Sequence, residues 1–376
     1  MTLGVILLVV IFTVLANGAA MQQATASSAP RMAGQEYKNI QVLKNIPADQ
    51  LVPTMQFISA SLGVECEFCH VEREMDKDDK KTKKTAREMM TMMFALNKDN
   101  FKGEREVTCN TCHRGGIRPQ AIPAILAEAP KPAREENEHE HDTSPASLPS
   151  GDPVMAKYLE ALGGPAALDR VATRVEKGNA LMPGGRGMPI EVFAKSPDQR
   201  VSVMRTPNGE SVTAYNGHEG WLAAPGRPLR EMAASDQYAA KVDATAFFPA
   251  HLAKVFDELK LQPNLETIGG HATTVVLGIT QGEPPAKLYF DQQSGLLVRI
   301  LHYSDTALGL NPTQVDFADY RAVDGVKTPF RWTIARPSGA FTIQLDDVQD
   351  NTPIDDAKFV KPVQPPEPGL GTNSAH

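Results

Sequence analysis

The sequence predicts a multidomain protein, in which a mainly α domain precedes an α+β domain built on an antiparallel sheet. Three observations carry this prediction. Two copies of one five-residue motif lie among helical segments in the first third of the chain. A stretch rich in charge and proline follows, and such a composition cannot bury a core. Beyond it, short apolar runs alternate with turn signals, a pattern typical of antiparallel strands. At 376 residues the chain is long enough for two domains.

The repeated motif is C-x-x-C-H, the attachment pattern of a c-type haem. Its two thiols can each add to one vinyl group of a porphyrin, and the adjacent histidine can then bind the iron. All four cysteines of the chain lie in the two motifs. We therefore expect two covalently attached haem c groups, and no other cysteine chemistry. The residues concerned are Cys66, Cys69 and His70 in the first motif, and Cys109, Cys112 and His113 in the second.

Two other interpretations of the cysteines are open. They could form two disulfides, which an exported chain permits, but the two histidines at the same offset would then be coincidental. They could also bind zinc through four thiolates. Paired zinc motifs usually lie about 15–20 residues apart, and the stretch from Cys69 to Cys109 is much longer.

The N-terminus indicates export. An apolar run from Leu3 to Ala16 is followed by small residues up to Ala20, which predicts a signal peptide over residues 1–20. Because no Lys or Arg precedes the apolar run, an uncleaved N-terminal anchor stays open. Either case places the protein in the periplasm or another extracytoplasmic space. No internal run approaches the roughly 18 apolar residues of a membrane span, so membrane association is peripheral or N-terminal at most. The net charge of −7 gives no reason to expect nucleic-acid binding.

The remaining boundaries follow from composition. Residues 21–34 are small and polar and predict a disordered leader, and residues 35–123 hold both motifs. Residues 124–151, with the charged run Arg134 to Asp142, predict a flexible linker. Residues 152–361 form the second domain and residues 362–376 a disordered tail. Since few contacts cross such a linker, we expect the two domains to be separable.

The second domain shows a helix and then strands. Helical spacing predicts a helix from Val154 to Leu162, which Gly163 and Gly164 end. Helical patches between Pro228 and Leu261 interrupt the strands, and the two tryptophans, Trp221 and Trp332, are expected in the core. The predicted strands include Ile190–Phe193, Arg200–Met204, Thr274–Leu277, Lys287–Phe290 and Leu296–Ile300, and the predicted turns are at Asn208-Gly209, Asn216-Gly217, Asp291–Gly295 and Asp324-Gly325.

Each haem iron needs a sixth ligand or an open position, and methionine precedes both motifs on predicted helices. One helix spans Pro53 to Leu62, and a second spans Thr85 to Asn97. Methionine opposite histidine raises the reduction potential of a haem. The candidates are Met55 on the first helix, and Met89, Met90, Met92 and Met93 on the second.

Four segments of the first domain resemble the photosynthetic reaction-centre cytochrome c subunit family, over about residues 35–123. They are Glu36–Leu43, Pro53–Ile58, Ala86–Met92 and Val107–Gly115. In that family a helix with an axial methionine precedes each C-x-x-C-H. The resemblance implies Met55 as the ligand of the first haem and Met89 as the ligand of the second, with Met92 as a rival one turn further on. Met90 and Met93 are expected as core or haem-wall residues. The family subunit carries four haems, so this chain matches one half of it.

Residues 152–361 resemble the LolA/LolB-like lipoprotein-carrier fold, an incomplete antiparallel barrel with helices in its concave face. The features are diffuse: Gly220-Trp221, Leu288–Asp291, Phe317–Arg321 and Asp324–Pro329. This resemblance implies a role in docking or in binding an apolar ligand. The domain shows no nucleophile–base constellation, phosphate loop or metal cluster. Its scattered histidines are expected to be surface or hydrogen-bonded residues: His218, His251, His271 and His302.

These features predict an exported dihaem cytochrome that carries electrons between redox partner proteins, and not an enzyme. Two alternatives remain. One haem iron could be open and react with peroxide, or the second domain could bind an apolar ligand with the haems as accessories. The charge run from Asp76 to Lys84 could dock an acidic redox partner, or it could be a solvated loop.

Overall fold

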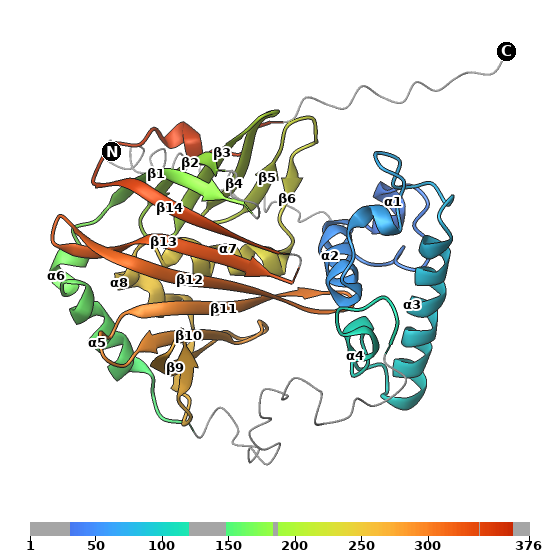
Figure 1. Ribbon diagram of the computed structural model, residues 1–376, viewed down its shortest axis with the longest axis horizontal. Coiled ribbons are helices and arrows are strands. Elements are labelled where there is room, and N and C mark those ends of the chain that lie inside the picture. The colour runs from blue at the N-terminus through green and yellow to red at the C-terminus, as the bar shows by residue number, and fades with distance from the viewer. Residues whose placement is uncertain (1–30, 120–147, 183–186, 338, 364–376) are drawn as a thin grey trace, which may run out of the picture.

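The protein consists of a helical N-terminal part and a β-rich C-terminal part (Figure 1). A computed structural model describes residues 31–119, 148–182, 187–337 and 339–363. The predicted signal peptide, most of the leader, most of the linker and nearly all of the tail lie outside these residues. Within the described part of the chain, no helix is long and apolar enough to cross a membrane.

The helical part corresponds to the predicted cytochrome domain and is named here the cytochrome module. It surrounds a small apolar cluster, named here the module core. Its buried members are Ala33, Leu43, Leu51, Phe57, Met90, Met93 and, from the other domain, Leu308. The elements are α1 Ala33–Glu36, η1 Ala48–Gln50, α2 Leu51–Leu62, η2 Cys66–Phe68, α3 Lys81–Asn100 and α4 Cys109–His113.

The module begins earlier than the sequence predicted. Ala33, which we assigned to the disordered leader, is fully buried in the module core. Its amide donates a hydrogen bond of 2.8 Å to the carbonyl of Ile46. A small apolar residue in a polar stretch carries no local signal of burial, so only the folded partner segment reveals this boundary.

Helix α2 ends in direct contact with the second motif. Gly63 ends the helix in a left-handed conformation (φ +65°), which glycine adopts without strain. A Cβ at Gly63 would lie 2.2 Å from the carbonyl oxygen of Gly115. The Gly115 amide in turn donates to the Ser61 carbonyl at 2.9 Å. This close approach joins the end of α2 to the segment that follows His113.

The C-terminal domain is one antiparallel sheet of 14 strands. The order is β6-β5-β4-β3-β2-β1-β14-β13-β12-β11-β10-β9-β7, and β8 pairs with β9. The strands are β1 Thr173–Leu181, β2 Gly187–Lys195, β3 Gln199–Thr206, β4 Gly209–Asn216, β5 Gly220–Ala223, β6 Arg230–Glu231, β7 Glu258–Leu261, β8 Glu266–Ile268, β9 His271–Ile279, β10 Ala286–Asp291, β11 Leu297–Thr306, β12 Gly309–Val323, β13 Val326–Arg336 and β14 Gly339–Asp350. The predicted strands and turns are confirmed, and Trp221 and Trp332 are buried.

Helices cover one face of this sheet. They are α5 Asp152–Leu162, α6 Pro165–Leu168, α7 Ala234–Thr245 and α8 Pro249–Leu252, with the short 3-10 turn η4 Ala253–Val255. The 3-10 turn η5 Asp356–Phe359 packs on the opposite face, where Phe359 joins Val201, Ala214 and Trp221. Helix α7 contacts β3, β4 and β5 and also β11, which are far apart in the strand order. The sheet must therefore curl around α7, and the result is the open half-barrel with a helix in its concave face that the sequence predicted.

Part of the concave face is charged. Arg174 of β1 forms a two-pronged ion pair with Asp350 of β14, at 2.7 and 3.0 Å. His302 of β11 pairs with Asp243 of α7 at 3.0 Å. Burial raises the pKa of Glu176 to about 7. Buried charged and polar groups of this kind are not the lining that an apolar ligand needs.

The boundary of the C-terminal domain and its separation from the cytochrome module also differ from expectation. Pro149 and Gly151, assigned to the linker, hydrogen-bond to strand β7 through Leu261 and Leu259, so the domain includes them. The β11–β12 hairpin reaches across to α2 (Figure 1). Cutting the linker would leave this contact intact, so the expected simple separation of the two domains must be revised.

Candidate haem site

A cavity of about 280 Å³ lies between α2, α3 and the second motif. Its wall is mainly apolar and it contains both cysteines and the histidine of that motif, as a haem site requires. It also reaches the first motif, through Phe68 and Cys69. The lining residues are Ile58, Leu62, Phe68, Cys69, Lys81, Thr82, Thr85, Ala86, Met89, Met90, Met92, Met93, Leu96, Val107, Thr108, Cys109, Cys112, His113 and Ile117.

One face of α3 forms a continuous side of the cavity. Residues three or four apart lie on the same face of a helix, and this stripe runs from Thr82 through Met89 and Met92 to Leu96. The side chains of Met89 and Met92 are 41% and 55% exposed. Both are placed to reach a group in the cavity, so Met89 as the ligand stays a prediction and Met92 stays its rival.

The inner wall of the cavity is also the edge of the module core. Met90 and Met93 are buried members of that core and line the cavity as well. They are therefore core and wall residues, as the sequence predicted. Helix α3 thus places Met90 and Met93 in the buried core and Met89 and Met92 on the exposed side of the cavity, because the 3.6-residue period turns the two pairs to different sides of the helix.

Both motif histidines are held in the orientation that iron binding needs. Nδ1 of His113 lies 3.0 Å from the carbonyl oxygen of Gly116, and Nδ1 of His70 lies 2.8 Å from that of Met75. A carbonyl only accepts hydrogen bonds, so Nδ1 carries the proton and Nε2 keeps its lone pair. A metal-binding histidine commonly donates its other ring N–H, the one that does not face the metal, to a backbone carbonyl. The donor sets of both motifs therefore fit haem iron.

The second motif is held by a cap and a brace. Thr108 caps α4: its amide donates to the Thr111 hydroxyl at 3.0 Å, and the Thr111 amide donates to the Thr108 carbonyl. Asn97, buried near the end of α3, donates to the Val107 carbonyl at 2.7 Å and accepts from the Val107 amide at 3.0 Å. This pair of bonds fixes the segment before Cys109 to the helix that carries the methionines.

We expect Asn97→Ala to destabilise the cytochrome module by about 1–3 kcal/mol, because it leaves the amide and carbonyl of Val107 without partners. Thermal unfolding followed by haem absorbance measures this. Asn100→Ala is the matched control, since the exposed Asn100 side chain bonds to the Leu96 carbonyl within its own helix. Equal effects of the two substitutions would contradict the brace.

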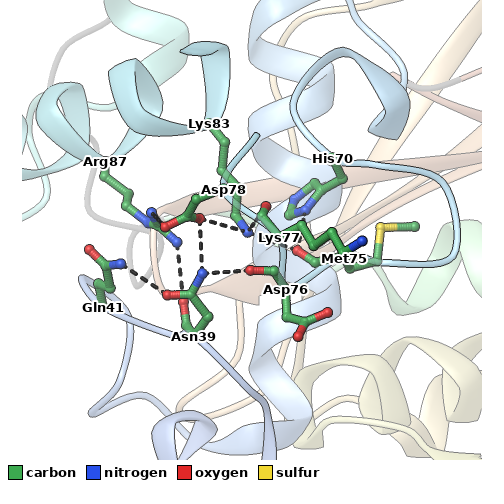
Figure 2. A network of polar contacts seen from close by, with 9 residues as sticks. All are labelled: Asn39, Gln41, His70, Met75, Asp76, Lys77, Asp78, Lys83 and Arg87. Carbon is green, nitrogen blue, oxygen red and sulfur yellow. Dashed lines mark hydrogen bonds and ion pairs between the residues drawn. The ribbon is translucent and has the colours of Figure 1, made fainter. Parts of the chain in front are cut away.

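A polar network supports the first motif (Figure 2). The Met75 carbonyl that pairs with His70 also accepts from the Lys83 ammonium at 2.9 Å. Asp78 accepts from Arg87 at 2.9 Å and lies 3.2 Å from Lys83. The hydrogen bond from Arg87 is the main cause that holds the pKa of Asp78 below its usual range. The Asp78 carboxylate therefore stays charged at neutral pH, and the network stays formed.

This network changes the interpretation of the charge run Asp76 to Lys84. Asp78 and Lys83 lie inside the network, and Lys80 donates to the Glu67 carbonyl of the first motif. The run is therefore neither a simple solvated loop nor a wholly free docking surface. Lys81 and Lys84 stay exposed, and Lys81 borders the cavity.

The first site is less completely defined than the second. Met55 lies on α2 and packs, half-buried, against the module core. Among the described residues the cavity wall includes Cys69 but not Met55, Cys66 or His70. Met55 as the ligand of the first haem therefore stays a prediction. Before haem is attached, burial raises the pKa of the Cys69 thiol, and of the Cys109 thiol at the second site.

Several supporting residues escaped the sequence analysis. Asn39, Asp78 and Asn97 are polar residues in polar surroundings, and no local pattern distinguishes them. The Thr108 cap could have been found, because a threonine directly precedes the α4 segment. The role of Leu308 could not have been found from the sequence, because Leu308 lies in the other domain.

The fold and the site together define a c-type cytochrome module joined to an antiparallel β domain. Residues 11–191 match the photosynthetic reaction centre cytochrome C subunit family. The chain is 35% identical, over 101 residues, to the photosynthetic reaction center cytochrome c subunit of Thermochromatium tepidum, and the match covers 26% of this chain and 25% of that protein. It is 34% identical over 82 residues to cytochrome c-554 of Chloroflexus aurantiacus, covering 20% of each chain.

These similarities confirm the resemblance of the cytochrome module and indicate covalently bound haem c. The chain spans about a quarter or less of the length of these relatives. A LolA superfamily protein from Nitrosomonas europaea aligns with 57% of this chain and 98% of its own, at 14% identity and a TM-score of 0.38. The description of the C-terminal domain as a half-barrel comes from its strand order.

Proposed function

We propose that this protein is an exported dihaem c-type cytochrome that transfers electrons between partner proteins. The observation that carries the proposal is the second site, where His113, with Nδ1 bonded to a carbonyl, shares an apolar cavity with Cys109, Cys112 and the methionine stripe of α3. The equivalent bond at His70 supports a second haem at the first motif. Haem c supplies reversible one-electron chemistry when bound.

The protein residues would set the properties of the haems. Cys66 and Cys69, and Cys109 and Cys112, would hold them covalently, and His70 and His113 would bind iron on one side. Met55 and Met89 would bind on the other, which raises the potential and leaves no position for a substrate. The apolar wall excludes water, which also favours a high potential. These roles suit electron transfer better than peroxide chemistry.

The exposed charges and the N-terminal run of the chain indicate which redox partner the protein binds and where it acts. Two exposed lysines of α3, Lys81 at the cavity border and Lys84 one turn further on, favour a redox partner with an acidic docking surface. The apolar N-terminal run favours export to the periplasm. For the C-terminal domain we propose docking rather than apolar-ligand transport, because part of its concave face is charged and its hairpin already contacts the cytochrome module.

Visible and near-infrared spectra of the purified protein test this function. We expect c-type bands on reduction, a weak near-infrared band from methionine bound to ferric iron, and no shift with carbon monoxide. Ready binding of carbon monoxide to the unmutated reduced protein would instead show an open iron, and the peroxidase-like alternative would replace electron transfer. Mass spectrometry of a lipid extract tests the apolar-ligand alternative.

A further inference from the structure

The tip of the β11–β12 hairpin, residues 305–309, is internally braced. The Thr306 hydroxyl donates to the Gly309 carbonyl at 2.7 Å and accepts from the Gly309 amide at 3.1 Å. Ser235 of α7 donates to the Asp305 carbonyl at 2.9 Å. A tip fixed by its own bonds and by α7 can present its side chains in one position.

This tip is inserted into the cytochrome module. Leu308 is 1% exposed and belongs to the module core, with Phe57, Met90 and Met93. A Cβ at Gly309 would lie 2.6 Å from the Phe57 ring, so only glycine allows this aromatic ring to approach the strand. The core of the cytochrome module is therefore completed by the other domain.

The module core is also the inner wall of the haem cavity. Met90 and Met93 belong to both, and the half-buried Ile58, Val107 and Cys109 pack against the core while lining the cavity. Removing Leu308 would leave a void in the core that includes the wall residues Met90 and Met93, and side chains around a void relax toward it.

A second contact holds the segment that leads into the second motif. Arg105 donates to the Asp305 carboxylate at 2.8 Å and to the Thr306 carbonyl. Arg105 lies shortly before Cys109 in the chain, and Asn97 braces the same segment from α3. The hairpin tip thus takes part in the core that borders the second site, and it bonds to the segment that leads into the second motif.

We propose that the β11–β12 hairpin tip is a positioning element of the second haem site, with Leu308 filling the core to which the wall residues Met90 and Met93 belong and Arg105 locking the segment before Cys109 to Asp305. This rests on the proposed function, because it assigns a role toward a haem. The C-terminal domain thereby gains a definite role, since it sets the ligation and the potential of a haem that it does not itself bind.

The test compares Leu308→Ala with Leu310→Ala in the full-length, haem-loaded protein. Both are leucines of the same hairpin, but Leu310 is 46% exposed. We expect Leu308→Ala to weaken the near-infrared band, to lower one of the two reduction potentials and to make one haem reactive with carbon monoxide, because core side chains that relax into the void displace the cavity wall. We expect Leu310→Ala to change none of these.

A lower melting temperature for Leu308→Ala with unchanged band and potentials would overturn the proposal, because a merely structural role predicts that result. Arg105→Gln provides a second route if Leu308→Ala does not fold, since the Arg105 side chain is half-exposed. It should move the same potential in the same direction, and an unchanged potential would overturn the proposal. If the unmutated protein lacks the near-infrared band, the methionine ligation fails, but the difference in potential between the two leucine variants still decides the role of the hairpin.

Discussion

Replacing Cys109 and Cys112 by serine should remove one haem from the chain and leave the other attached. Each C-x-x-C-H forms two thioether bonds to one porphyrin, and the chain has no further cysteine to replace them. The intact mass of the unmutated protein should exceed that of the processed polypeptide by two haems. The serine variant should exceed it by one.

The reciprocal variant, Cys66→Ser with Cys69→Ser, is the matched control. It should also retain one haem, and its spectrum should be that of the second site alone. The two single-haem spectra should add up to that of the unmutated protein. An unmutated mass without added haem would contradict the cofactor assignment, and loss of both haems from either variant would show that the sites do not load independently.

Replacing Met89 by alanine should open the second haem to carbon monoxide and remove its part of the near-infrared band. Met89 lies on the cavity face of α3, and His113 lines the same cavity from α4. Loss of the thioether leaves the iron with histidine alone, which lowers the potential and exposes a binding position. Met55→Ala should have the same effect at the first haem.

Met75→Ala is the control for this experiment. Met75 is exposed, and its contacts with His70 and Lys83 use only its backbone carbonyl, so its side chain should be dispensable. If Met92→Ala removes the band and Met89→Ala does not, the ligand is the residue one turn further along the same face. If neither does, the cavity-facing methionines are not ligands.

Much of the local structure followed from the sequence because its causes are local. The turns at Asp291–Gly295 and Asp324-Gly325 depend on residues that tolerate left-handed backbone, and Gly295 and Gly325 have φ of +72° and +87°. The alternating runs became strands because period-2 burial needs only one apolar face. Helix α3 was predicted from its periodicity but begins earlier, at Lys81, because Lys83 is held by the network around Asp78 and not by apolar packing.

The predicted domain boundaries were wrong where a residue is fixed by contacts with residues distant in the sequence. Ala33 and Gly151 are small residues in stretches whose composition indicates a leader and a linker. Each is fixed by hydrogen bonds to a segment distant in the sequence, Ile46 for the first and Leu259 for the second. Composition averages over neighbours in the chain, whereas burial depends on neighbours in space.

By itself, the sequence predicted the chemistry of this protein: four cysteines and two histidines at fixed spacing form the attachment pattern that predicts two haems, because that pattern depends on residues adjacent in the chain. The tertiary structure decided what surrounds them. It brought Met89 and Met92 to the wall of the cavity that holds a correctly bonded His113, and it inserted Leu308 of the β domain into the core behind that wall. Such contacts join residues far apart in the sequence, and only the packing of the whole chain selects them.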